Sequence, residues 1–461
     1  MPTINGILDI GRQSLFAQQQ NIQVTGDNIA NVNTPGYTRR RTNLVTSPQL
    51  DDPSIGQIGT GVTATHVARV FDRFIGGQIN DAAGDLGRWE AQENSLSRVE
   101  MVFNESQGYG LNQAMSDFWN AWQDLANNPS GASERAVLTA KSSYLSDTFQ
   151  KMRSDLSSVQ QDVDIQIAGT VADINTMSTR LTELNTEIVN IEKNGQHANA
   201  QRDQRDTLLR DMGELISFTS TESADGRVTV TLDDGNQLVG ISPFGQLTTV
   251  TNAATGLSDI AWDTAPGAPV NATITSGKLK GWLDTRDTIV AGAIGQMDAL
   301  AGDMITRVNT QHAAGFDLTG GAGVNFFTGT SAADMAVNSV VSADPRRIAA
   351  ASDLGGLPGG GGNAIALANL QYSATMSSGS ATYDDYYNGL VSTVGIEKAK
   401  ASNYRSYQES TLSQLANYRD SISGVSIDEE MVKLVEFEHA YNAAAKLIST
   451  VDQMLDTLLK M

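Results

Sequence analysis

Residues 426–459, SIDEEMVKLVEFEHAYNAAAKLISTVDQMLDTLL, carry the most regular apolar pattern in this chain. Apolar side chains recur at two positions of a seven-residue repeat, which is the pattern of a helix that packs along a second helix. Ser426 and Glu429 have the spacing of a capping box, and Asp428 adds negative charge to the same first turn. We therefore predict a C-terminal helix with a seam of Ile427, Leu434, Phe437, Tyr441, Ala444, Ile448, Val451, Leu455 and Leu458.

The N-terminal segment repeats the same period with a weaker seam. Leu8, Leu15, Ile22 and Ile29 recur every seven residues, but the companion positions are mostly small or polar. The Pro35-Gly36 pair then ends the helix, because a proline disfavours helix at the preceding residue. Burying the apolar residues of either seam stabilises its helix by less than the conformational entropy that ordering the helix costs. Each terminal helix therefore needs a partner. We expect the two terminal helices to pair in a coiled coil.

The middle of the chain changes pattern twice. A 3–4 spacing of apolar residues predicts one long helix from an N-cap at Ser133 towards Lys193, ended by Asn194-Gly195. Period two then takes over, and Arg227–Leu232 alternates between the turn pairs Asp225-Gly226 and Asp234-Gly235. Helical patterns follow at 279–312, from 364, and at 395–421, with a glycine-rich loop at 355–362.

These segments predict a nested, mainly α multidomain chain with a β-rich insertion. We expect residues 1–70 with 396–461 to form the terminal coiled-coil region and residues 71–214 with 276–395 to form a bundle of long helices. Residues 215–275 would then be a small β-rich domain inserted innermost.

The overall composition narrows the classes of partner. The chain has 461 residues, 31 basic against 52 acidic, and a net charge of −21, so we expect no nucleic acid partner and no membrane insertion. Cysteine is absent, which excludes disulfides and thiol nucleophiles. The first residues lack a basic n-region and no run of 18 apolar residues occurs. We therefore expect neither a cleaved signal peptide nor a membrane-spanning helix.

A search for catalytic, cofactor and metal motifs returns no candidate residues. The histidines, His66, His197, His312 and His439, have no metal-ligand spacing. Residues 59–64 match GxGxxG/A, but no buried strand precedes them and the residues that follow alternate as a strand does. Asp317 is best explained by a turn, and residues 39–41 by a solvated or subunit-bridging basic patch. We expect no catalytic residue, no metal and no cofactor.

Two terminal blocks resemble the flagellar rod, hook and hook-associated protein family. The block at residues 28–39, NIANVNTPGYTR, matches the signature shared by that family, and residues 59–62 with 69–72 match its next block. The C-terminal blocks at 423–431, 441–445 and 455–459 resemble the helix of the hook-associated protein 1 family more specifically.

Interior blocks agree with this resemblance and cover nearly the whole chain in order. They lie at 276–281, 286–287, 309–318, 323–327, 344–345 with 348–350, and 363–370. The chain is short for the family, which suggests that an outer domain is reduced or missing. His439 stands where a glutamine-like residue is more usual.

The resemblance implies a structural adaptor between hook and filament. Such a subunit is made in the cytoplasm, binds an export chaperone through its C-terminal region and leaves through the flagellar type III apparatus. It then assembles as a ring with copies of itself on the hook protein, outside the cell, and templates the second hook–filament junction protein and the filament. The implied assembly interface comprises both seams and Asn31, Asn33, Pro35, Gly36 and Tyr37. We expect the terminal helices to be disordered in the free chain and to fold on assembly.

Two alternatives stay open from the sequence. The shared N-terminal block also fits another axial flagellar protein, such as a hook or second junction protein. An adhesin or enzyme displayed from residues 215–275 is the other alternative, although that insertion is short and has no catalytic cluster.

Overall fold

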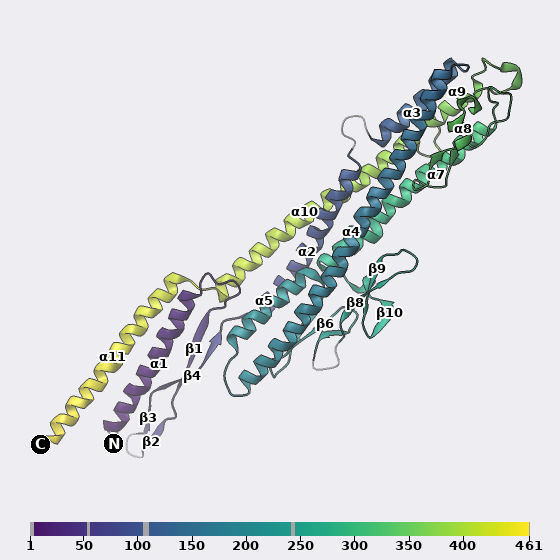
Figure 1. Cartoon of the computed structure of the whole chain (residues 1–461). Helices are drawn as coiled ribbons and strands as arrows, with labels where there is room; N and C mark the ends of the chain where they lie inside the picture. Colours follow the sequence, from purple (N-terminus) through teal and green to yellow (C-terminus); the bar gives the residue numbers. More distant parts are fainter. Residues whose placement is uncertain (1–3, 53–55, 105–109, 241–244, 461) are drawn as a thin grey trace.

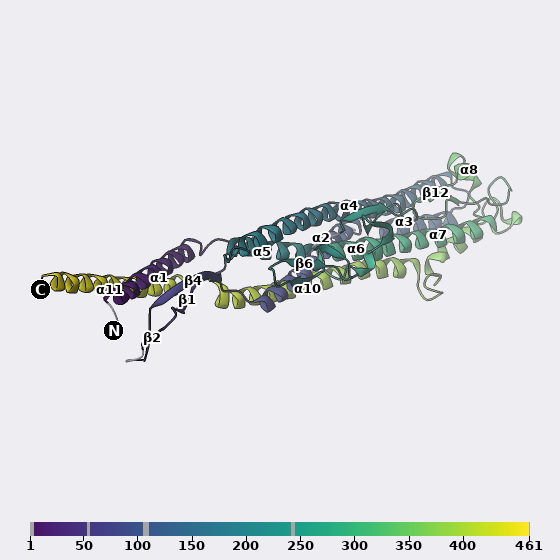
Figure 2. The same cartoon turned by 90° about the horizontal axis from the view of Figure 1, so that it is seen from below.

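The two ends of the chain lie side by side at one end of an elongated, mainly helical molecule (Figure 1). This computed structural model describes residues 4–52, 56–104, 110–240 and 245–460. Figures 1 and 2 both show helices α1 and α11 at one end, a bundle of long helices in the middle, and α3, α7 and α8 at the other. The predicted fold class is confirmed, since helices dominate and the strands form small sheets.

The helices are α1 Ile4–Ala30, α2 Arg73–Val102, α3 Leu111–Asn127, α4 Ala132–Glu192, α5 Asn199–Leu215, α6 Gly277–Leu283, α7 Ala291–Ala313, α8 Ser339–Ala343, α9 Gly362–Ala368, α10 Tyr383–Ser423 and α11 Ile427–Leu459. The strands are β1 Arg40–Thr46, β2 Leu50–Asp52, β3 Gly56–Ile58, β4 Val62–Arg69, β5 Thr219–Glu222, β6 Val228–Thr231, β7 Gln237–Val239, β8 Leu247–Thr251, β9 Ser258–Trp262, β10 Ala265–Pro269, β11 Phe327–Thr328 and β12 Ala336–Val337. Helices α6 and α7 are joined by a wider helical segment, Asp284–Val290.

The long helix α4 is the spine of the bundle. Its 61 residues span about 90 Å, and its predicted apolar stripe is buried along most of its length. The predicted N-cap at Ser133 is wrong, because the helix begins at Ala132 after Gly131 and Ser133 lies inside its first turn. The predicted stop is confirmed, since Gly195 follows the helix with φ +72°.

Helix α10 begins earlier than predicted. The spacing of apolar residues predicted a helix from residue 395, but the helix starts at Tyr383. Thr382 and Asp385 form a capping box there, with the Thr382 hydroxyl accepting from the Asp385 N–H. The helix then runs unbroken along α2 to Ser423, so the domain boundary expected between residues 395 and 396 falls inside one continuous helix.

The β-rich insertion packs directly onto the bundle. It forms two three-stranded antiparallel sheets, ordered β5-β6-β7 and β10-β9-β8. The predicted turn glycines, Gly226 and Gly235, both have positive φ. Val230 and Ile260 are fully buried and share one core with Ile174 of α4. The strands therefore complete the apolar face of α4, while the proposed division into domains stays a prediction.

A second core fills the far end of the bundle. It is rich in aromatic rings from α3 and the segment before β11, with the centroids of the Trp122 and Phe326 rings 5.2 Å apart. His312 of α7 is fully buried among them. Its Nδ1–H donates to the Val324 carbonyl and its Nε2 accepts from the Ala349 N–H. Burial lowers the pKa of His312 to about 4, so the ring is neutral at pH 7.

Candidate assembly interface

Helices α1 and α11 run antiparallel in close contact along most of their length (Figure 1). A Cβ added at Gly11 would lie 2.8 Å from Ile448 Cγ1, so the small residue permits the close approach. The predicted pairing of the two terminal helices is therefore confirmed.

The predicted seam residues differ in how far this pairing buries them. Ala444 and Val451 are buried. Partly buried seam positions are Leu8, Leu15, Ile22, Ile29, Leu434, Phe437, Ile448 and Leu455. Exposed positions are Ile427, Tyr441 and Leu458.

The exposed ends of the seam have a simple geometric reason. The contacts of Gly11 with Ile448 and of Asn28 with Glu430 set the register of the two helices. In that register Ile427 lies beyond the end of α1, and Leu458 lies beyond the first described turn of α1.

Apolar side chains also face outward from this helix pair. Phe16 on α1 is 65% exposed, and Val432 and Met454 on α11 are 69% and 55% exposed. These side chains have no covering element among the described residues, and Met431, Val435 and Leu447 of α11 are exposed as well, so the helix pair leaves apolar surface in contact with solvent.

The predicted turn after α1 is built by its own side chains. The Asn31 amide donates to the Asp27 carbonyl at 2.9 Å and so caps the end of the helix. Gly36 has φ +80°, and a Cβ there would lie 2.4 Å from Thr207 Oγ1 of α5. Only glycine fits this position. Asn33 and Pro35 are exposed at the tip of the turn.

The basic run after this turn pairs within the chain. Arg39 is buried, and its guanidinium donates to Glu429 at 2.9 Å and to the Ile422 carbonyl at 3.1 Å. Arg40 pairs with Asp27 at 2.8 Å. The expectation of a solvated patch is wrong for Arg39, which is buried against its partners, while Arg40 is only partly buried. A role of this run in bridging subunits stays a prediction. Glu429 binds Arg39 across the corner between α10 and α11.

An ion network joins the helix pair to the bundle. Asp203 of α5 is buried and accepts from the Thr38 hydroxyl at 2.6 Å and from Arg69 of β4 at 3.1 Å. Arg69 also donates to Asp206 at 2.5 Å. Burial raises the pKa of Asp206 despite the opposing Arg69 charge. The sequence analysis did not predict this network. The Arg-Asp pairs at 202–203 and 205–206 of α5 were the pattern that could have indicated it.

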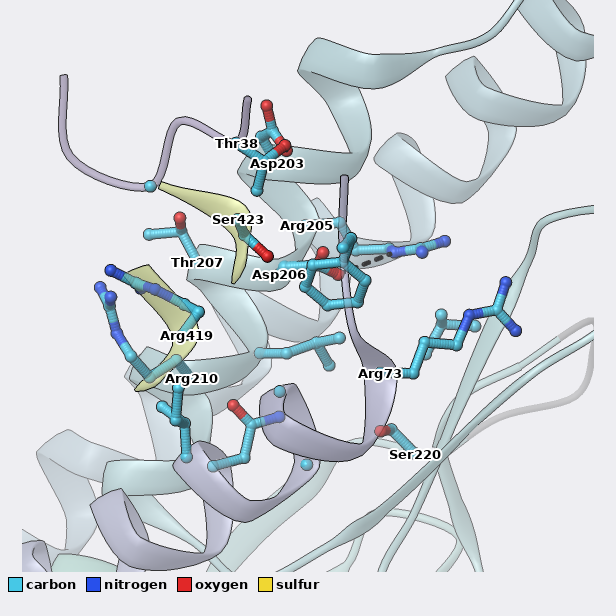
Figure 3. A pocket seen from close by; sticks show the side chains of 18 of the residues that line it. Thr38, Arg73, Asp203, Arg205, Asp206, Thr207, Arg210, Ser220, Arg419 and Ser423 are labelled. Atoms are coloured by element: carbon cyan, nitrogen blue, oxygen red, sulfur yellow. Dashed lines mark hydrogen bonds and ion pairs between the residues drawn. The ribbon is translucent and has the colours of Figure 1, made fainter. Parts of the chain in front are cut away.

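A cavity of ≈ 230 Å³ lies at the same joint (Figure 3). It is lined by the 36–38 turn, the start of α2, α5, β5 and the end of α10. In this view Arg210 and Arg419 lie on one side and Arg73 on the other. Each of these arginines has a carboxylate partner, which leaves the lining with no excess of one charge. The cavity therefore lies where the terminal helix pair connects to the helical bundle.

The other sequence candidates have structural explanations. The 59–64 stretch leads into β4, an antiparallel partner of β1, which is not the buried parallel strand that a dinucleotide site requires. The Asp317 carboxylate accepts from the Thr319 and Gly321 N–H groups, forms an ion pair with Arg347 and so holds its own turn. Within the described part of the chain, no three His, Asp or Glu side chains are grouped so as to hold a metal. In the same part, no helix is long and apolar enough to cross a membrane.

Comparisons with known proteins match both ends and the middle of the chain. The flagellar hook-associated protein FlgK helical domain matches residues 96–327. The flagella basal body rod protein family matches residues 8–38, and the flagellar basal body rod FlgEFG protein C-terminal family matches residues 419–461.

Similar whole proteins and a similar solved structure agree with these matches. Flagellar hook-associated protein 1 of Bacillus subtilis is 31% identical over 98% of this chain and 97% of that protein. The Escherichia coli protein of the same name is 24% identical over 99% of this chain and 100% of that protein. That alignment has 546 positions for a chain of 461 residues, so the relative has segments that this chain lacks. The structure of the flagellar hook junction protein FlgK from Burkholderia pseudomallei shares the fold, with a TM-score of 0.66 at 16% identity over 75% of this chain and 100% of that chain.

Proposed function

The chain belongs to the flagellar hook-associated protein 1 family, and from this premise we propose that it is the adaptor subunit that joins hook to filament. The family is one of structural proteins of the bacterial flagellum. The finer proposal is that copies form a ring on the hook tip, which then templates the second junction protein and the filament. The subunit acts without catalysis.

The observation that carries this proposal is the outward apolar surface of the terminal helix pair. Phe16 lies on one helix of the pair and Met454 on the other, so the two present different surfaces. Contact between two different surfaces of identical subunits is heterologous, and such contacts generate rings when the rotation closes. We propose that the helix pair that the seam residues hold together, with its outward side chains and the 31–37 turn, forms this interface, with the hook protein below and the second junction protein above.

We further propose how the subunit reaches that place. It is exported from the cytoplasm through the flagellar type III apparatus, with a chaperone bound to its C-terminal region. Val432 and Met454 of α11 are the kind of exposed apolar side chains that such a chaperone would cover before assembly. The terminal region, the helical bundle and the β-rich insertion are proposed as separate units of the assembled subunit.

Deleting the gene tests the adaptor role directly. Cells without the subunit should build hooks and release filament protein into the medium, and an antibody to this chain should label the hook tips of intact cells. Filaments of normal length on the deleted cells would refute the proposal.

A surface substitution tests the proposed interface more finely. Phe16→Ser should leave the helicity of the free chain unchanged and should reduce filament number per cell severely. Gln19→Ser, an exposed change on the same helix, is the matched control and should behave as wild type. Equal filament numbers for the two variants would remove Phe16 from the interface.

Hydrogen exchange tests whether the terminal helices fold on assembly. The free chain should show rapid exchange at residues 4–31 and 427–458, because the pair alone buries little apolar surface. Strong protection of both segments in the free chain would contradict this part of the proposal.

A further inference from the structure

A fully hydrogen-bonded asparagine lies at the bundle-facing end of the terminal helix pair. Asn28 of α1 is 1% exposed. Its amide nitrogen donates to the Arg40 carbonyl and to Glu430 Oε2, both at 2.9 Å. Its amide oxygen accepts from the Arg40 N–H and the Tyr37 hydroxyl, both at 2.9 Å. These contacts satisfy the donors and acceptors that one side-chain amide offers.

The partner of Asn28 on α11 is a buried carboxylate. Glu430 is 2% exposed and also accepts from Lys433 at 2.6 Å. A buried carboxylate that loses a hydrogen-bond donor is strongly disfavoured. The contact between Asn28 and Glu430 is therefore available only where the two helices meet in one alignment.

The rest of the seam specifies that alignment weakly. It repeats every seven residues, so sliding α1 along α11 by seven residues again brings apolar positions together. The α1 side of the contact includes Gly11, Ala17 and Thr25, which are too small to interlock strongly with one set of neighbours. A slip of seven residues would place Asn28 opposite Phe437 in one direction and before the start of α11 in the other.

We propose that Asn28 and Glu430 fix the register of α1 against α11. A single buried polar pair that is satisfied in one alignment makes every other alignment costly, which is the best-attested use of such groups in helix pairs. The proposal concerns the folded chain alone and does not depend on the adaptor role.

A rival explanation places register control in the chain connection. The Arg39 N–H donates to the Ser423 carbonyl at 2.8 Å, and this backbone bond ties the segment between α1 and β1 to the end of α10, next to the start of α11. If that bond were sufficient, Asn28 would be dispensable for register. Replacing Asn28 leaves this backbone bond available, so a substitution separates the two explanations.

The absence of cysteine from the sequence makes a clean cross-linking test possible. A chain with Gly11→Cys, Ile448→Cys and Leu455→Cys offers the new thiol on α1 two competing partners on α11, one for the observed register and one for a slip of seven residues. A second chain with Tyr441→Cys in place of Leu455→Cys tests the opposite slip. Seven residues span about 10.5 Å of helix, which is too far for one register to form both disulfides.

Mild oxidation of the full-length chain traps the alignments in which the two helices meet whenever the pair forms, and peptide mass spectrometry gives their ratio. The otherwise unaltered chains should favour the observed register by at least about tenfold, the factor that one hydrogen bond to a charged group supplies. Asn28→Val should bring the ratio near one. Asn21→Val, one repeat earlier and also buried, is the matched control and should keep the original ratio.

A double variant guards against simple misfolding. Asn28→Val with Glu430→Leu leaves no buried charge unpaired, so it should fold with normal helicity and still give mixed registers. An unchanged ratio in Asn28→Val and in the double variant would overturn the proposal in favour of the backbone connection. Equal ratios in chains that retain Asn28 would overturn it as well.

Discussion

Acidification should destabilise the far core through His312. The ring is fully buried, and protonation would turn Nε2 into a donor facing the Ala349 N–H. The folded-state pKa is about 4, below the usual value of about 6.5, so the unfolded chain takes up the proton first as the pH falls. The stabilising contribution is therefore present above pH 6.5 and is lost as the pH falls towards 4.

The size of this effect follows from the two pKa values. For one group with pKa about 4 when folded and about 6.5 when unfolded, lowering the pH from 7 to 5 costs about 2 kcal/mol of the free energy of unfolding. His312→Gln keeps an amide oxygen that can accept from Ala349 and does not titrate. It should cost stability at pH 7 and should lack this part of the pH dependence.

Urea titrations at pH 7, 6 and 5 measure the difference. Trp122, whose ring lies 6.2 Å from that of His312, reports unfolding of this core by fluorescence. Carboxylates that titrate in both proteins cancel when the two pH dependences are subtracted. A wild-type loss between pH 7 and 5 that exceeds the variant's loss by less than about 0.5 kcal/mol would refute the neutral, buried state of the ring.

Three further substitutions test the joint and the core by thermal or urea unfolding. Gly36→Ala should lower the free energy of unfolding by at least about 1 kcal/mol, because φ is +80° and Thr207 occupies the space of a Cβ. Its control, Gly26→Ala, adds a Cβ that meets nothing within 4 Å and should be neutral or stabilising. Equal effects of the two substitutions would contradict this account of the turn. Asp203→Ala should cost about 3 kcal/mol, because its buried donors lose their acceptor, and a loss below about 1 kcal/mol would mean that water replaces it. Leu181→Ala, at a buried position of α4, should cost about 2–5 kcal/mol, and the exposed Ile165→Ala on the same helix should stay within about 0.5 kcal/mol.

Local patterns in the sequence predicted the elements that depend on near neighbours. The seven-residue repeats predicted that the terminal helices pair, since a helix displays every third or fourth residue on one face. Asp225-Gly226 predicted a tight turn between strands, and Asn194-Gly195 predicted the end of the longest helix. The predicted N-cap at Ser133 is wrong because the helix begins before it, at Ala132. A sequence pattern locates the end of a helix only to within about one or two residues.

Only the tertiary structure determined which distant groups meet. Asp203 binds Thr38 and Arg69, and Asn28 binds Glu430, across 134 to 402 residues of chain. Hydrophobic periodicity carries no information on such pairs, because it records which face of a helix is buried and not what lies opposite. The sequence by itself therefore determined the helices, their apolar faces and the family. The register of the terminal pair, the ion network at the joint and the neutral state of His312 depend on distances that exist only after the chain has folded.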